Sequence, residues 1–231
     1  MTQLPDRSDR RLVVAIALWI AAIAMASMFD RAIAVWVHNS GLQAWMDAHD
    51  GVAQALKTPG LYYFTLAVVL VVTLVHPLGW RAGGFMLLAT LVSGLNGLIK
   101  WMVGRTRPFK LSLYDSAGHA RAAPFVLAPF RGGLRGIVHE MNLSFPSGHA
   151  ALAFATAAAL AMLWPRSRWR WVAYVVAAIV AFERVAENAH WLSDTVGAAA
   201  LGVGGVYLIH WLLMRLLPAG VTGKASHDPA A

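Results

Sequence analysis

Long runs of apolar residues, separated by polar stretches, constrain this chain more than any other feature. The runs are Leu12–Phe29, Gly60–Val75, Ala82–Ile99, Ala150–Trp164, Trp171–Phe182 and Thr195–Met214. A helix needs about 20 apolar residues, with a range of roughly 17 to 25, to cross a bilayer core. Only 13% of all residues are charged, about half the share in a soluble domain. These features predict an all-α fold, an integral membrane bundle of six transmembrane helices.

The run Trp171–Phe182 is the shortest of the six. Its flanking residues Arg168, Trp169 and Arg170 can lengthen it, because long basic and aromatic side chains reach the membrane surface from within. We therefore expect one membrane domain over residues 1–217, followed by a disordered cytoplasmic tail over residues 218–231. The chain has no cysteine, which excludes disulfides, a thiol nucleophile and cysteine-ligated zinc.

Lys and Arg predict the orientation, because positive residues near span ends are retained in the cytoplasm. The short segments on one side hold Arg7, Arg10, Arg11, Arg81, Arg166, Arg168, Arg170, Arg215 and Lys224. The short segments on the other side hold only Arg31, Lys57 and Arg184. Both termini are therefore predicted to be cytoplasmic. The loop of residues 100–149 then lies outside, and its seven basic residues call for a functional reason: Lys100, Arg105, Arg107, Lys110, Arg121, Arg131 and Arg135.

The first run has two interpretations. Arg10, Arg11 and the sequence Ala24-Met25-Ala26 resemble a cleavable signal peptide. Cleavage would leave five spans and place the termini on opposite sides, so we expect a retained anchor.

The segment between Asp30 and Pro59 also has two interpretations. Its apolar residues are spaced as on a helix that lies in the outer membrane interface. They are Trp36, Val37, Leu42, Trp45, Met46, Val52 and Leu56. A connector with aromatic anchors fits the same pattern equally well.

Polar residues suited to chemistry form three clusters, each at the outer end of a predicted span. The clusters are KWMVGRTRP (100–108), SFPSGHA (144–150) and ERVAENAHWLSD (183–194). In the second cluster Pro146 and Ser147 predict the turn and cap that start a helix, and Gly148 allows close backbone approach. A helix start binds anions, phosphate above all. A bound phosphate dianion would favour the protonated form of His149, which makes His149 a candidate general acid.

In the third cluster His190 and Asp194 are four residues apart and share one helix face. Asp194 can accept a hydrogen bond from one ring nitrogen of His190 and leave the other as a nucleophile. Lys100, Arg107 and Arg184 supply positive charge, and the two arginines can bind phosphate bidentately. Arg105 is a possible further phosphate ligand or an interface residue. The sequence therefore predicts phosphoryl chemistry outside the membrane.

These three clusters resemble the signature of the type 2 phosphatidic acid phosphatase superfamily. The residues that match are Lys100, Arg107 and Pro108, then Pro146, Ser147, Gly148 and His149, then Arg184, His190 and Asp194. The serine that begins the third motif is replaced by Glu183. A carboxylate there can pair with Arg184 and weaken its hold on phosphate, and we expect Glu183 to point away from the site.

The resemblance implies a phosphohistidine mechanism without cofactor or metal. His190 would attack phosphorus, Asp194 would hold His190, and His149 would protonate the leaving oxygen. Lys100, Arg107, Ser147, Gly148 and Arg184 would bind the phosphate. The implied partners are the bilayer and a lipid phosphate: undecaprenyl pyrophosphate, phosphatidylglycerophosphate, phosphatidic acid or a lipid A phosphate. Nucleic acid is not an expected partner. The implied place is a bacterial inner membrane, with the site facing the periplasm.

Other functions remain open at the level of sequence. His149, His190 and Asp194 are also three residue types that bind metals. The same phosphohistidine would permit transfer between two lipids instead of hydrolysis. A lipid-phosphate-binding or transport bundle without turnover is a further possibility, although both histidines are present.

Overall fold

The computed structural model describes residues 7–110, 127–130 and 143–216. The α-helices in this part are α1 (Arg7–Asn39), α2 (Leu42–Ala48), α3 (Asp50–Lys57), α4 (Tyr62–Val75), α5 (Trp80–Leu91), α6 (Asn96–Val103), α8 (Gly148–Leu163), α9 (Trp169–Ala186) and α10 (Leu192–Leu216). The short 3-10 helices are η1 (Thr58–Gly60), η2 (Val92–Leu95) and η3 (Pro108–Lys110). All six predicted apolar runs are helical, so the prediction of an all-α fold is confirmed.

Several helices are long and apolar enough to cross a membrane. Three qualify alone, Arg10–Asn39, Trp80–Val103 and Leu192–Leu216, and a fourth forms if Asp50–Gly60 and Tyr62–Val75 are one span bent by 50°. Helix α8 has only 16 residues, and α9 carries three charged residues, Arg170, Glu183 and Arg184. The described residues thus contain three to four candidate spans, and the chain is a multi-pass membrane protein.

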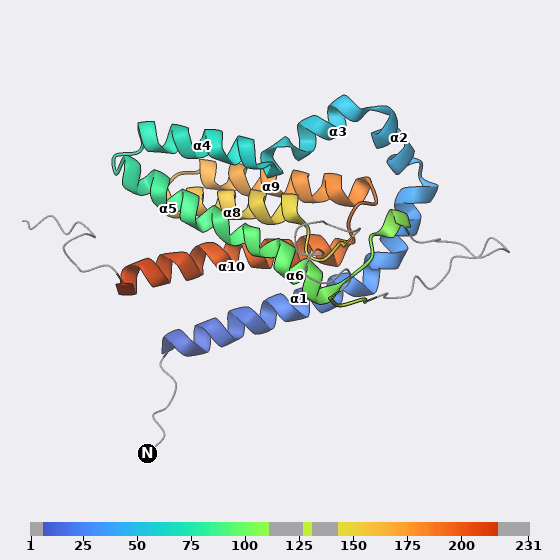
Figure 1. Cartoon of the computed structure of the whole chain (residues 1–231), viewed down its shortest axis with the longest axis horizontal. Helices are drawn as coiled ribbons and strands as arrows, with labels where there is room; N and C mark the ends of the chain where they lie inside the picture. The colour runs from blue at the N-terminus through green and yellow to red at the C-terminus, as the bar shows by residue number, and fades with distance from the viewer. Residues whose placement is uncertain (1–6, 111–126, 131–142, 217–231) are drawn as a thin grey trace, which may run out of the picture.

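Helices α4, α5, α8, α9 and α10 run side by side, and α1 slants across one side of them (Figure 1). Helices α2 and α3 lead from the far end of α1 back to the start of α4 (Figure 1). The ends of α6 and α9 and the starts of α8 and α10 therefore gather at one end of the bundle, where the three clusters lie.

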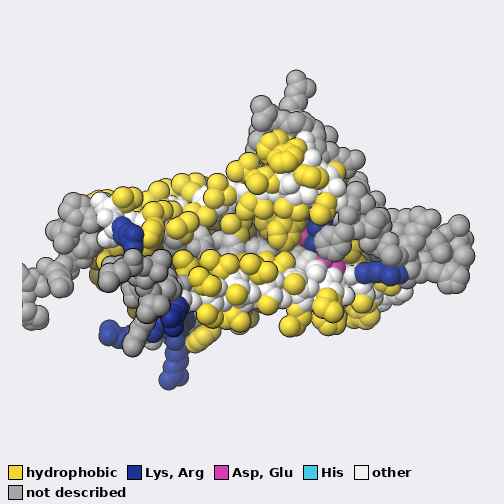
Figure 2. Space-filling view, turned by 90° about the horizontal axis from the view of Figure 1, so that it is seen from below, with side chains coloured by type: hydrophobic (Ala, Val, Ile, Leu, Met, Phe, Trp, Pro, Cys, Tyr) yellow, Lys and Arg dark blue, Asp and Glu magenta, His cyan; other side chains and the backbone are white. Residues whose placement is uncertain are grey.

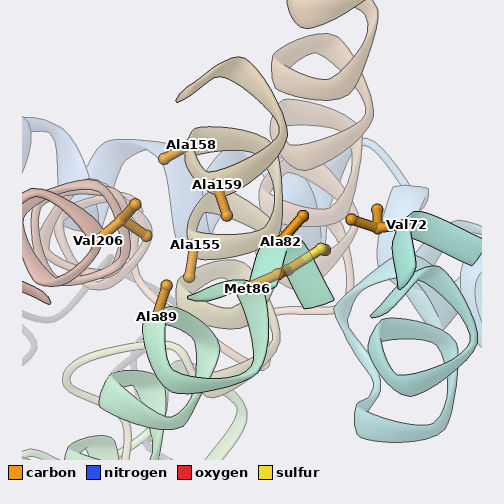
Figure 3. Packing of buried hydrophobic residues seen from close by; sticks show 8 residues of the cluster. All are labelled: Val72, Ala82, Met86, Ala89, Ala155, Ala158, Ala159 and Val206. Atoms are coloured by element: carbon orange, nitrogen blue, oxygen red, sulfur yellow. The ribbon is translucent and has the colours of Figure 1, made fainter. Parts of the chain in front are cut away.

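Small residues let α8 occupy the centre of the bundle. Ala155, Ala158 and Ala159 of α8 are buried against residues of α4, α5 and α10, namely Val72, Ala82, Met86, Ala89 and Val206 (Figure 3). On α10, a Cβ atom at Gly202 would lie 2.4 Å from the carbonyl oxygen of Ala151, so only glycine permits this approach. Small residues at helix contacts are typical of membrane bundles, where close backbone packing replaces the hydrophobic drive.

The outer surface is apolar along the helices. Leu18, Leu70 and Leu74 are at least 60% exposed, and apolar side chains cover most of the face in Figure 2, whereas Lys and Arg lie toward its ends. Exposed leucines over the length of a bundle suit contact with lipid rather than water.

The connection after the first apolar run is helical over most of its length, from Asp30 to Gly60. Residues Asp30 to Asn39 continue α1, and the helix ends where Gly41 adopts a positive φ of 76°. Helices α2 and α3 pack on α9 through Met46, Ala53 and Ala186. Two causes extend α1: Ala34 and Val37 are buried, and Asp30 has buried polar partners that remove the penalty of a carboxylate in an apolar helix. The predicted tail over residues 218–231 and most of the outer loop lie outside the described residues.

Candidate active site

The three clusters meet around one cavity of about 170 Å³ at the end of the bundle. Its lining comes from η1, α4, α6, α8, α9 and the connections beside them: Gly60, Leu61, Tyr62, Asn96, Lys100, Arg107, Gly148, His149, Arg184 and His190. Residues as far apart in the sequence as Gly60 and His190 thus share one small space. The predicted convergence of the clusters is what the structure shows.

Three cations border this cavity. Lys100 is in the last turn of α6 and is only 2% exposed. Arg107 is half-buried, and its Nε donates to the carbonyl of Leu143 at 3.2 Å. Arg184 is in the last turn of α9 and is also buried. Three positive charges around a cavity of this size favour a compact anion with two or more negative charges.

The start of α8 closes one side of the cavity. Ser147 is the N-cap residue, as predicted, but its hydroxyl makes no capping hydrogen bond. The Ser147 Oγ is buried and finds no hydrogen-bond partner in the described part of the chain. The hydroxyl is therefore not used as a cap, and Ser147 itself is not among the residues that line the cavity.

Gly148 lies against Asn96 of α6. A Cβ atom at Gly148 would lie 2.7 Å from the amide end of the Asn96 side chain. In the amide orientation that satisfies both neighbours, Asn96 donates to the Pro146 carbonyl at 2.9 Å and accepts from the Gly148 N–H at 3.2 Å. Asn96 therefore fixes the turn before α8, and part of the donor capacity of this helix start is used within the protein.

His190 and Asp194 face each other as predicted, although His190 precedes α10 rather than lying on it. The His190 Nδ1 is 3.5 Å from the Asp194 Oδ2. That oxygen also accepts the Trp191 N–H at 2.9 Å. A separation of 3.5 Å is longer than a hydrogen bond, as is common before substrate binds. Since Nδ1 faces Asp194, Nε2 is the nitrogen available to a ligand.

The protonation state of His190 suits nucleophilic attack. Burial lowers the pKa of His190 to about 4, since it disfavours the charged ring. Asp194 opposes this shift, and the positive charges of Lys100 and Arg107 add to it. His190 is consequently neutral at pH 7, with a free lone pair on the ring.

Glu183 is not among the residues that line the cavity, but it pairs with Arg184, as the sequence allowed. Glu183 is completely buried, and both of its oxygens accept from Arg184: the Nε at 2.5 Å to Oε2, and the Nη2 to Oε1. Arg184 Nη2 also donates to Glu187 Oε2 at 2.5 Å. The physical reason is burial, because an ionised carboxylate without a cation is very costly in an apolar bundle. Two carboxylates therefore compete with any anion for Arg184.

Arg105 does not lie with the other arginines. It is 4% exposed and donates to Asp194 Oδ1, Asp30 Oδ2 and Ser193 Oγ, each at 2.7 Å. Its guanidinium also covers the Trp191 ring, 5.1 Å from the ring centroid. Arg105 is therefore not part of the cavity lining and is buried, and it is a partner of Asp194.

Within the described residues, no three His, Cys, Asp or Glu side chains are grouped so that they could hold a metal ion. His149 lines the cavity from the first turn of α8, and Asp194 lies behind His190 rather than beside His149. His149, His190 and Asp194, the three residues of metal-binding type, are therefore not grouped as a metal site in the described part of the chain.

Sequence reasoning missed three residues at this site. Asn96, which belongs to none of the three clusters, also lines the cavity. Gly60 brings η1 against α8, where a Cβ atom would be 2.6 Å from the His149 carbonyl oxygen. Asp30 is joined to Asp194 through Arg105. The signal for Asp30 was present, because a carboxylate within an apolar helix needs a partner.

The fold and this cavity define a class: helical membrane proteins with a basic, two-histidine cavity at one end of the bundle. The profile described as "PAP2 superfamily" matches residues 78–217, more than half of the chain. The chain belongs to this superfamily, which confirms the resemblance seen in the three clusters.

Two relatives in sequence are a lipid A 1-phosphatase from Rhizobium johnstonii and one from Rhizobium etli. Each is 34% identical over 146 residues, which are 60% of this chain and 53% and 56% of the two relatives. A third, the bacitracin transport permease protein BcrC of Bacillus licheniformis, is 30% identical over 42% of this chain and 46% of its own. The chain spans about half the length of the curated relatives it matches.

A solved structure has the same fold. It is the crystal structure of a transmembrane PAP2-type phosphatidylglycerolphosphate phosphatase from Bacillus subtilis. The TM-score is 0.51 at 20% identity, and the match covers 85% of this chain and 98% of the other.

Proposed function

We propose that this protein is a membrane-embedded lipid phosphatase that works through a phosphohistidine. The observation that carries the proposal is the cavity itself, where Lys100, Arg107 and Arg184 surround two histidines. Membership of the PAP2 superfamily and the lipid phosphatases among the relatives support it. The site needs no cofactor or metal, because the cations of the protein balance the charge of the phosphoryl group.

His190 attacks first. Its Nε2 forms a bond to phosphorus as the bond from phosphorus to the lipid oxygen breaks, and His149 gives a proton to that leaving oxygen. Asp194 holds the ring through Nδ1 and stabilises its developing positive charge. A water molecule then attacks phosphorus, the bond to Nε2 breaks, and His149 takes the proton of the water. Free phosphate leaves and both histidines return to their starting states.

The phosphoryl oxygens bind to the cations and to the start of α8. Lys100, Arg107 and Arg184 balance their charge. The buried Ser147 hydroxyl is a further donor, and the Gly148 backbone supports close approach. Arg184 must exchange a carboxylate for phosphate, and Glu187 is the easier one to release because its side chain is 20% exposed whereas that of Glu183 is buried.

The proposed topology has six spans in one domain over residues 1–217, a tail over 218–231 and both termini in the cytoplasm. The distribution of charge supports it, because Arg81, Arg168 and Arg215 lie at the end of the bundle away from the cavity. The cavity then faces the periplasm from a bacterial inner membrane.

A lipid A 1-phosphate is the first substrate to test, because the two Rhizobium relatives are lipid A 1-phosphatases. The cavity of about 170 Å³ suits a phosphoryl group but not acyl chains, which would stay in the bilayer. Phosphatidylglycerophosphate, undecaprenyl pyrophosphate and phosphatidic acid present the same group at the membrane surface and form the rest of the panel.

The test is release of free phosphate from this panel by the purified protein in detergent, with excess chelator in a parallel series. We expect release from at least one lipid with water as the sole acceptor, at the same rate with chelator. Release that requires a second lipid as acceptor would indicate a phosphotransferase. Loss of release in chelator would indicate a metal enzyme, and no release from any lipid would contradict the proposal.

A further inference from the structure

A second carboxylate lies behind the proposed catalytic pair. Asp30 is on α1, before the region that the family profile matches, and is 3% exposed. Both of its oxygens are engaged by Ser193: Oδ1 accepts the backbone N–H at 2.8 Å and Oδ2 the hydroxyl at 2.6 Å. An ionisable residue buried in a membrane helix is costly, so its presence there points to a role at a functional site.

Arg105 joins this carboxylate to the site. Its Nη2 donates to Asp30 Oδ2 and its Nη1 to Asp194 Oδ1, both at 2.7 Å. One planar guanidinium therefore bridges two carboxylates, a geometry that a lysine ammonium does not reproduce. Asp194 is left with Oδ2 for the backbone of Trp191 and for His190.

The charges of this group do not cancel. Two carboxylates and one guanidinium leave one negative charge, and the open oxygen of Asp194 directs it at His190. Without the charge of Asp30, Arg105 would neutralise Asp194, and the developing positive charge on the His190 ring would lose its counter-charge. Solvent does not replace that charge, since Arg105 and Asp194 are 4% and 0% exposed.

The surroundings of His190 make this counter-charge important. The titratable and charged groups toward it are Lys100 of α6, Arg107 after α6, His149 of α8, Arg184 of α9 and Asp194 of α10. Asp194 is the acidic one in this set. Glu183 and Glu187 are occupied by Arg184.

We propose that Asp30 is a positioning residue for catalysis, which offsets the charge of Arg105 so that Asp194 remains a net negative, correctly oriented partner of His190. This inference rests on the proposed phosphohistidine function. It makes α1 part of the catalytic apparatus, although α1 contributes no residue to the cavity lining within the described part of the chain.

The corner that carries His190 is also tied to α1 and α2 by a second contact. The Asn188 side-chain nitrogen donates to the Ala34 carbonyl at 3.2 Å and to Gln43 Oε1 at 3.0 Å. This contact holds α1 against the corner without a charge. Removing the charge of Asp30 therefore need not detach α1. The role of Asp30 in balancing the charge of Arg105 can thus be separated from any role in holding α1 in place.

The experiment compares Asp30→Asn and Asp30→Glu with the wild type, using phosphate release from the best lipid of the panel. Asp30→Asn keeps the size of the side chain and removes its charge. We expect kcat to fall about 10- to 100-fold with KM nearly unchanged, as for other residues that orient a catalytic group. The acidic limb of kcat/KM should move to lower pH, since His190 loses part of the negative field that favours its protonation. Asp30→Glu keeps the charge, so its kcat/KM should fall at the same acidic pH as that of the wild type.

Ser193→Ala is the matched control, because it removes a hydrogen bond to Asp30 but no charge. Its acidic limb should stay at the wild-type pH. Size-exclusion chromatography and thermal unfolding establish that each variant is folded. Asp30→Ser tests the same loss of charge if the amide of asparagine does not fit.

A folded Asp30→Asn with wild-type kcat and pH profile would overturn the inference, as would a shift of equal size in Ser193→Ala. Failure of both Asp30→Asn and Asp30→Ser to fold would assign Asp30 to the fold of α1 and overturn it too. An inactive wild type would contradict the proposed function itself, whereas an active wild type with unaffected variants contradicts only the role of Asp30.

Discussion

The two ends of the helix bundle both carry basic residues, but in opposite environments. At the cavity end Lys100, Arg105 and Arg184 are only 2%, 4% and 6% exposed. Arg105 and Arg184 are held by carboxylates. A buried cation is tolerated only where anions or hydrogen-bond acceptors compensate for its lost hydration.

At the opposite end the basic residues are on the surface. Arg81 and Arg215 are exposed, and each lies over a neighbouring tryptophan, Trp80 or Trp211, at 5.7 and 4.2 Å from the ring centroid. Arginine over an aromatic ring at a helix end is typical of the membrane surface. The comparison teaches that the basic residues divide by burial: those at the end away from the cavity are exposed, whereas Lys100 and Arg184 beside the cavity are buried.

Neutralising one cation at each end tests this division most strongly. Lys100→Met removes a buried charge that the phosphoryl group needs, and kcat/KM is expected to fall about 100- to 1000-fold. Arg81→Met at the other end is the matched control and should stay within about twofold of the wild type. Steady-state phosphate release measures both variants. Comparable losses of kcat/KM in the two would show that the buried and the exposed basic residues do not differ in their roles.

The pH dependence sharpens the account of the cavity end. His190 must be neutral to attack, and burial lowers the pKa of His190 to about 4. Because kcat/KM reports the free enzyme, it should be level between about pH 5 and 7 and fall about tenfold per unit below about pH 4. An acidic limb close to the ordinary histidine pKa of about 6.5 would show that His190 is not buried in this way.

A smaller effect is expected from the carboxylate that Arg184 must release. Glu187→Gln weakens the competition for Arg184, so inorganic phosphate should inhibit about 3- to 10-fold more strongly, as for one charged hydrogen bond. Asp50→Asn, an exposed acid on α3, is the control and should leave inhibition unchanged. The inhibition constant for phosphate measures the difference. Equal constants for Glu187→Gln and the wild type would show that Glu187 does not compete with phosphate for Arg184.

The sequence was sufficient to predict the helices and the convergence of Lys100, Arg107, His149, Arg184 and His190. The reason is physical: apolar runs specify where helices cross the membrane, and residues at the same ends of packed helices are brought together. The spacing of His190 and Asp194 also predicted their contact correctly, although the helix starts at Leu192, after His190.

The partners of buried charges were predictable only in part: the sequence allowed the pair Glu183–Arg184, but it did not indicate the partners of Arg105. Glu183 pairs with Arg184, and Arg105 with Asp30 and Asp194, because each buried ion takes the nearest opposite charge in three dimensions. Adjacent residues on a helix do not ordinarily face each other, so the pair Glu183–Arg184 runs against the local pattern. The first apolar run ends at Phe29, so the sequence did not single out Asp30, whose partners come from segments 75 and 163 positions away.

The most direct test of the phosphohistidine at His190 is to trap it. The protein is mixed with its best lipid phosphate and quenched in alkali within one turnover, because phosphohistidine is stable in base. The phosphorylated peptide is then identified by mass spectrometry. The account predicts covalently bound phosphate on His190. A folded His190→Ala variant should show neither bound phosphate nor release of free phosphate. Phosphate on another residue, or undiminished release by His190→Ala, would contradict the account.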